Sequence, residues 1–142
     1  MNTKLVYCTK TNHSKKIADA INTACSIPAE NVKSNPVLKK VDLMILVGGI
    51  YGSESLPEMI SFVQSLDQKS VRKVALVTSC VSKRHSQKEV RNILMNKGII
   101  VVDEFICQGN LLFFGLGHPN KSDLENAVTF SKEVIGVVEA QK

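Results

Sequence analysis

Hydroxyl and amide side chains gather in one short segment near the amino terminus, where they could bind a phosphate. The segment consists of Thr9, Lys10, Thr11, Asn12, His13 and Ser14. It leads into a predicted helix, whose free N–H groups and dipole favour an anion at the helix amino terminus. Hydroxyls can also bond several phosphate oxygens without adding charge. An ordinary polar turn, with Ser14 as the helix cap, remains the alternative interpretation.

A glycine-rich segment further along the chain could lie against a flat ligand. Its sequence is Gly48-Gly49-Ile50-Tyr51-Gly52-Ser53. Glycines permit close backbone approach and positive φ angles. The ring of Tyr51 suits stacking on a planar heterocycle. The alternative is a structural turn with a packed tyrosine.

Small polar residues follow a third apolar run, in the order Thr78-Ser79-Cys80-Val81-Ser82. Alone, this segment is typical of a generic turn. Its position makes it more interesting, because each of the three segments follows a predicted strand. In a parallel sheet they would meet at one edge, outside the carboxyl ends of the strands, where ligands bind.

The rest of the chain predicts the scaffold that brings these segments together. Apolar runs alternate with amphipathic stretches, which indicates a parallel sheet with helices on both faces. We expect strands at 4–8, 31–34, 43–47, 73–78 and 99–107. We expect helices at 14–25, 56–66, 86–98 and from 122 to the end, the last three beginning with capping boxes. Those pairs are Ser55 with Glu58, Ser86 with Glu89 and Ser122 with Glu125.

Composition limits the class of protein. The 142 residues predict one domain, 1–142, and the 44% apolar and 22% charged residues are usual for a globular chain. No apolar run approaches the ~20 residues that span a bilayer. The first residues lack a signal-peptide pattern, so we expect a cytoplasmic protein without membrane insertion. The net charge of +5 is scattered, which favours attraction for anionic ligands or acidic partners over nucleic-acid binding.

The four cysteines and three histidines form no recognisable metal or catalytic pattern. No Cys-x-x-Cys pair occurs, and the histidines lack the spacing of zinc ligands. We therefore expect reduced thiols, no metal and no catalytic residue.

Residues 6–18, Val-Tyr-Cys-Thr-Lys-Thr-Asn-His-Ser-Lys-Lys-Ile-Ala, resemble the flavodoxin signature. Thr9, Thr11 and Ser14 match its hydroxyl positions. Asn12 stands where glycine is usual, and His13 where asparagine is usual. Asparagine tolerates left-handed backbone better than most residues, so the shape of the loop is expected to survive.

Two further segments carry the same resemblance. Gly49-Ile50-Tyr51-Gly52 resembles the flavodoxin loop that covers the flavin ring. Cys107-x-Gly109, followed by Gly117-His118-Pro119-Asn120, is similar to small bacterial flavodoxin-like proteins. The resemblance covers essentially the whole chain.

The resemblance implies a flavodoxin-like α/β fold: a doubly wound sheet of five parallel strands, in the order 2-1-3-4-5, with helices on both faces. It implies flavin mononucleotide (FMN) as the cofactor and electron transfer to or from a partner oxidoreductase as the function. The implied cofactor-binding residues are Thr9, Lys10, Thr11, Asn12, His13, Ser14, Gly49, Ile50, Tyr51, Gly52, Thr78, Ser79, Cys80 and Val81.

Several functional alternatives stay open. An electron carrier is favoured over a stand-alone enzyme, which would be an FMN-dependent oxidoreductase. The chain could also be a companion subunit of a larger reductase or quinone-linked oxidase, or an interaction module that has lost FMN. Flavodoxins are typically acidic, whereas this chain is basic and has Lys83, Arg84 and His85 after the third segment. These charges predict a less reducing flavin couple and an acidic redox partner.

Overall fold

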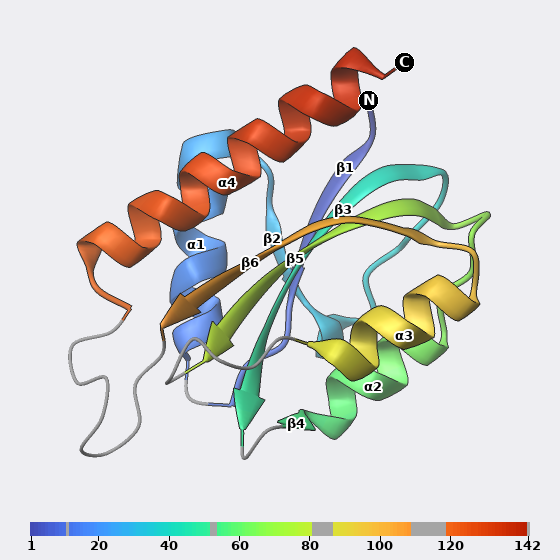
Figure 1. Cartoon of the computed structure of the whole chain (residues 1–142), viewed down its shortest axis with the longest axis horizontal. Coiled ribbons are helices and arrows are strands. Elements are labelled where there is room, and N and C mark those ends of the chain that lie inside the picture. The colour runs from blue at the N-terminus through green and yellow to red at the C-terminus, as the bar shows by residue number, and fades with distance from the viewer. Residues whose placement is uncertain (11, 52–53, 81–86, 109–118, 142) are drawn as a thin grey trace.

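Five parallel strands form the centre of the molecule (Figure 1). The computed structural model describes residues 1–10, 12–51, 54–80, 87–108 and 119–141, and for Tyr51, Cys80 and Gln108 it describes the backbone alone. The parallel strands are β1 (Thr3–Tyr7), β2 (Ala29–Asn31), β3 (Val41–Tyr51), β5 (Val71–Cys80) and β6 (Ile100–Gln108). Their order, β2-β1-β3-β5-β6, confirms the predicted doubly wound arrangement.

Helices cover both faces of this sheet (Figure 1). On one face lie α1 (His13–Cys25) and α4 (Lys121–Ala140), and on the other lie α2 (Pro57–Gln64) and α3 (Lys88–Asn96). Side chains that alternate along each strand separate the two cores. Leu5 and Ile45 pack with the α1 and α4 residues, whereas Val6 and Leu46 pack with those of α2 and α3.

A short antiparallel strand, β4 (Glu54–Ser55), is the one addition to the predicted sheet among the described residues. It folds back on the end of β3, pairing Ser55 with Ile50 and Glu54 with Tyr51. The observed strand β3 is therefore longer than the apolar run at 43–47 from which it was predicted. Three residues predicted to lie in a loop, Gly49, Ile50 and Tyr51, are strand residues.

Two of the predicted capping boxes, at α2 and α4, do not cap their helices. The N-cap of α2 is Leu56, without a side-chain hydrogen bond, and Ser55 lies in β4. The capping box of α4 is formed by Asn120 and Asp123, whose side chains bond each other's backbone N–H at 2.9 and 2.8 Å. The N-cap of α3 is Gln87, and Ser86 lies outside the described residues.

The edge strand also differs from its predicted range of 31–34. It ends at Asn31, where a 3-10 turn (Val32–Ser34) begins. The side chain of Asn31 accepts a hydrogen bond of 3.0 Å from the backbone of Lys33, which favours the turn over a longer strand.

Strand register brings the predicted segments to one edge. Gly48 and Gly49 of β3 pair with Thr78 and Ser79 of β5, and the backbone of Cys8 donates to Val47 at 2.9 Å. The arrowheads of β3, β5 and β6 point to this same edge in Figure 1. Within the described ranges, no helix is long and apolar enough to cross a bilayer.

Candidate functional site

The amino terminus of α1 is open to an anion. Asn12 is its N-cap, in left-handed backbone with φ 66° and ψ 4°, and its side chain makes no capping hydrogen bond. The carbonyl of Asn12 accepts the first helical bond, from Lys16 at 3.0 Å. No acidic residue lies in the first turn of α1. Helix N–H groups and the dipole are therefore available to a negative ligand here.

Two buried hydroxyls flank this helix terminus. Thr9 Oγ1 and Ser14 Oγ have no hydrogen-bond partner among the residues that the structure describes. Ser14 is fully buried, so its hydroxyl cannot bond solvent instead. An unpaired buried hydroxyl costs about 1–3 kcal/mol, which phosphate oxygens would offset by accepting its hydrogen bond. These two atoms fit a phosphate group, and Thr11 between them lies outside the described residues.

Basic and titratable side chains also belong to this turn. Lys15 Nζ lies 2.8 Å from Asp19 Oδ2, and this contact with Asp19 raises the pKa of the lysine. Partial burial, and then the charge of Lys16, lower the pKa of His13. Lys10 is exposed. A bound anion would stabilise the protonated form of His13 and raise its pKa.

The second segment combines a close backbone contact with a hairpin. A Cβ atom on Gly48 would lie 2.7 Å from both Gln87 Oε1 and Met59 Cε, so only glycine fits without displacing one of them. Ile50, which follows Gly49 in β3, is buried. Gly52 and the side chain of Tyr51 lie outside what the structure describes, so the predicted stacking by Tyr51 stays a prediction.

The third segment is held by hydrogen bonds inside the protein. Thr78 is fully buried; its hydroxyl donates to Glu104 Oε2 at 2.6 Å and accepts from Gln87 Nε2 at 3.1 Å. The side chain of Thr78 is thus engaged within the protein. Ser79 is also buried. Of Cys80 only the backbone is described, and Val81 lies outside the described residues.

Sequence reasoning missed two residues beside the site, Gln87 and Glu104. Gln87 is fully buried at the start of α3. The side chain of Glu104 is only 5% exposed and lies 2.7 Å from the guanidinium of Arg91. The available signal was an acidic pair, Asp103-Glu104, within an otherwise apolar strand. A buried carboxylate of this kind needs several donors nearby.

Cys8 follows β1 and is buried, with 2% of its surface exposed. Burial first, and then the negative charge of Glu58, raise the pKa of its thiol to about 11. The thiol therefore stays protonated near neutral pH and is a poor nucleophile. In the described part of the chain, no group of three or more His, Cys, Asp or Glu side chains could hold a metal ion.

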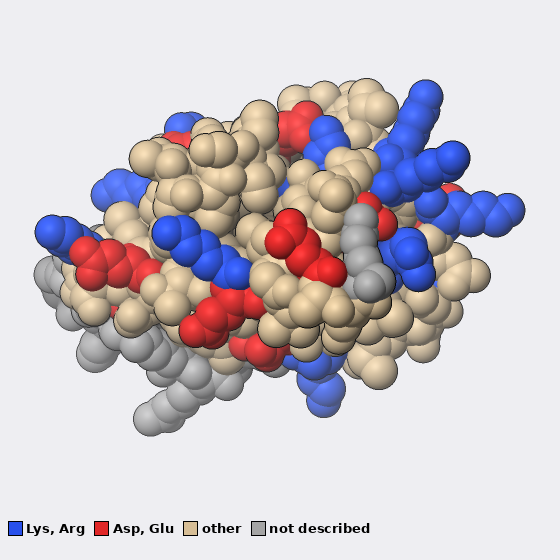
Figure 2. Space-filling model, turned by 90° about the horizontal axis from the view of Figure 1, so that it is seen from above, with Lys and Arg blue, Asp and Glu red and all other residues tan. Residues whose placement is uncertain are grey.

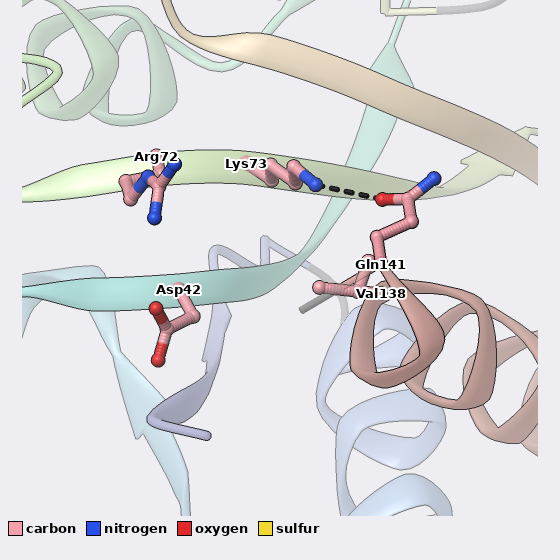
Figure 3. A pocket seen from close by; sticks show the side chains of 5 residues that line it. All are labelled: Asp42, Arg72, Lys73, Val138 and Gln141. Atoms are coloured by element: carbon pink, nitrogen blue, oxygen red, sulfur yellow. Dashed lines mark hydrogen bonds between the residues drawn. The ribbon is translucent and has the colours of Figure 1, made fainter.

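Charges of both signs cover the surface seen in Figure 2, with several Lys and Arg side chains at its right-hand end. A small hollow of about 90 Å³ lies at the amino ends of β3 and β5, opposite the candidate site (Figure 3). The side chain of Lys73 crosses part of this hollow, and its Nζ atom donates a hydrogen bond of 2.7 Å to Gln141 Oε1. Pockets for small molecules and cofactors are typically several times larger, so this hollow is not the cofactor site.

Comparisons with known proteins agree with this architecture. An uncharacterised protein of Methanocaldococcus jannaschii is 27% identical over 132 residues, covering 86% of this chain and 87% of that protein. A flavodoxin from the domain Archaea superposes with a TM-score of 0.74 at 14% identity, over 98% of this chain and 99% of the other. The flavodiiron core of Flv1 from Synechocystis superposes with a TM-score of 0.75 at 11% identity, over this whole chain but 37% of that longer one.

These structural likenesses establish the fold, and the match to a sequence family goes further. A family model described as a flavodoxin domain matches residues 4–123. The match runs from β1 into the first turn of α4 and includes all three predicted segments. The chain therefore belongs to the flavodoxin domain family.

Proposed function

We propose that this protein binds FMN at the carboxyl edge of its sheet and carries electrons to or from a partner oxidoreductase. The observation that carries the proposal is that Thr9 Oγ1 and Ser14 Oγ are buried without a hydrogen-bond partner among the described residues, at a helix terminus where Asn12 makes no side-chain cap. A flavin phosphate would give both hydroxyls an acceptor and place negative charge at the positive end of the helix dipole. Family membership supports the same cofactor.

In this proposal the chain supplies binding and orientation, and the flavin supplies the electron-transfer chemistry. Thr9, Thr11 and Ser14 hold the phosphate, together with the first N–H groups of α1. The backbone from Gly49 to Gly52 lies against the ring, with Tyr51 stacked on it. The proposal needs no catalytic side chain.

The phosphate site is tested by a Thr9→Ala, Ser14→Ala double variant, with Thr23→Ala as the matched control. Thr23 is on the same helix, but its hydroxyl bonds the carbonyl of Asp19 at 3.0 Å. Each lost hydrogen bond to the phosphate should weaken FMN binding by about 1.5–3 kcal/mol, whereas the control should bind normally. Riboflavin, which has no phosphate, should bind the wild type far more weakly than FMN. Equal affinities for FMN and riboflavin would rule out this site.

The ring position is tested at Tyr51. Stacking on the isoalloxazine should quench most of the fluorescence of bound FMN. Tyr51→Ala should restore part of the emission and loosen the flavin, while Tyr51→Phe, which keeps a ring, should do neither. Unchanged emission and affinity in the alanine variant would make Tyr51 a packing residue.

The acidic partner is inferred from the basic residues that follow the third segment. One unit charge about 8 Å from the reduced flavin is worth roughly 2 kcal/mol at an effective dielectric of about 20. A Lys83→Glu, Arg84→Glu variant should therefore have a more negative potential, most clearly at low salt, and should bind an acidic partner more weakly. Lys69→Glu, Arg72→Glu makes the same charge change beside the amino end of β5 and should leave the potential unchanged. An unchanged potential in the first variant would overturn the role of these charges.

A further inference from the structure

One edge of the sheet is long and apolar. Strand β6 stands last in the order β2-β1-β3-β5-β6, with β5 as its one strand partner among the described residues. It has nine residues, whereas β2, at the opposite edge, has three. Ile100 is 55% exposed, and it is followed along β6 by partly exposed apolar side chains: Val101, Val102, Phe105 and Ile106. An open edge of this length and composition is a template for a further strand.

The carboxylate of Asp103 lies on this open edge. Asp103 is exposed, and its Oδ1 atom accepts a hydrogen bond of 2.8 Å from the backbone N–H of Glu104. In an edge strand, the N–H groups that do not bond the neighbouring strand form a row along the open side. The N–H of Glu104 bonds a side chain, which places it in that row. The bond therefore holds the carboxylate where an added strand would place its own carbonyl groups.

The charge of Asp103 is not balanced within its own strand. No Lys or Arg occurs in β6, and its other acidic residue, Glu104, is 5% exposed and bonds the guanidinium of Arg91. A β-bulge at Val102 directly precedes Asp103 and strengthens the local twist of the edge. A strand added here would bury the Asp103 carboxylate without a basic partner from β6, which is strongly unfavourable.

We propose that Asp103 keeps the open edge of β6 from pairing with β6 of a second copy of this chain. A second copy suits this edge because antiparallel pairing about a two-fold axis sets the same apolar strand against itself. Asp103 stands next to the middle of the nine-residue strand, so symmetric pairing would bring two Asp103 carboxylates close together. Their repulsion and their loss of water both oppose association. The proposal does not depend on the proposed FMN function.

The first test removes the charge and measures self-association by sedimentation velocity over a series of protein concentrations. Asp103→Val should raise the association constant by about tenfold or more relative to wild type. Glu139→Val makes the same exchange at an exposed position of α4 and should stay within about twofold of wild type. Asp103→Thr, which is also uncharged and favours strands, carries the same test if the valine variant does not fold.

A lysine variant separates the charge from the hydrogen bond. Asp103→Lys removes the acceptor of the Glu104 N–H but keeps a charge on the edge, and lysine blocks edge pairing in natural sheets. This variant should therefore associate as weakly as wild type, within about twofold. Association as strong as that of Asp103→Val would overturn the proposal, because the charge would then not be what blocks pairing.

The second test locates the contact by hydrogen exchange in Asp103→Val. Backbone amides on the open side of β6, that of Glu104 among them, should exchange about tenfold more slowly in concentrated than in dilute protein, and those of β2 should not change. Adding Ile100→Lys should reverse the association, whereas Val37→Lys, at a valine 67% exposed before β3, should not. Unchanged association in both uncharged variants, or association without slower exchange in β6, would overturn the proposal.

Discussion

Gly48 and Gln87 share a space that admits only one side chain. A Cβ atom at position 48 would lie 2.7 Å from Gln87 Oε1, closer than such atoms approach in proteins. Because Gly48 has no side chain, β3 leaves room for the carboxamide of Gln87 at the start of α3. Through this contact, the first glycine of the second predicted segment is coupled to the N-cap residue of α3.

Gly48→Ala should therefore disturb both β3 and the start of α3. The methyl group forces Gln87 or Met59 to move, at a cost of about 1–3 kcal/mol of unfolding free energy, and FMN affinity should fall with it. Gly136→Ala is the matched control, because nothing lies within 4 Å of a Cβ at that helical position. It should stabilise the protein by about 0.5–1 kcal/mol. Denaturant unfolding of both variants measures the difference; equal stabilities would show that the space at Gly48 adapts freely.

Asn12 should be replaceable by glycine and not by a β-branched residue. Its φ of 66° lies in the left-handed region, which costs ordinary residues about 1–2 kcal/mol. Asn12→Gly should bind FMN normally, whereas Asn12→Val should lose about that much stability and bind FMN more weakly. Unfolding curves and flavin titrations report the two effects. Valine and glycine variants of equal affinity would mean that the loop does not use this backbone shape.

His13 should make stability depend on pH. Its pKa is lowered in the folded protein, so the unfolded chain takes up a proton more readily as the pH falls through about 6.5. The stability contributed by neutral His13 is therefore present above that pH and is lost below it. Flavin-free wild type should lose more unfolding free energy between pH 8 and pH 5.5 than His13→Asn does. Saturating phosphate should reduce the difference, and parallel pH profiles would contradict the prediction.

Cys8 should resist alkylation. With a pKa of about 11 instead of 9.0, its thiolate fraction at pH 8.5 is lower by about 75-fold, and burial blocks access as well. Iodoacetamide should therefore label the partly exposed Cys25 before Cys8 in native protein, as read by peptide mass spectrometry. Unfolded protein, where both label equally, is the control. Early labelling of Cys8 in native protein would place its thiol at an open surface.

The alternation of apolar runs was sufficient to predict the sheet and the helices on its faces, because buried parallel strands leave a continuous apolar signature. Helix starts were harder to predict. Ser122 and Glu125 have the spacing of a capping box, but Asn120 and Asp123 two residues earlier have an equivalent spacing and form it. Local pattern does not decide between two such pairs, since the packing of the helix sets where it begins.

At the candidate site, features formed by neighbouring residues could be predicted from the sequence, whereas contacts between residues distant in the chain could not. The proposed anion-binding turn consists of residues close together in the chain, so its hydroxyls can be recognised from their spacing in the sequence. The network of Thr78, Gln87 and Glu104 joins residues 9 to 26 positions apart in the chain. The position of Thr78 after an apolar run predicts a ligand-binding residue, but the hydrogen bonds of its hydroxyl to Glu104 and Gln87 could not be predicted from the sequence.

One extra residue in β6 decides the side on which Glu104 lies. Val74 pairs with Val101 and Ala75 with Asp103, so Val102 is a β-bulge opposite β5. If the same residues paired regularly from that register, without a bulge, Glu104 would pair with Val77 and its carboxylate would face the apolar core under α1 and α4. Because successive side chains of a strand point to opposite faces, adding or removing one residue between the bulge and Glu104 would move the carboxylate to the other face of the sheet. Among related sequences, a single insertion or deletion between this bulge and Glu104 should occur only together with loss of the acidic residue.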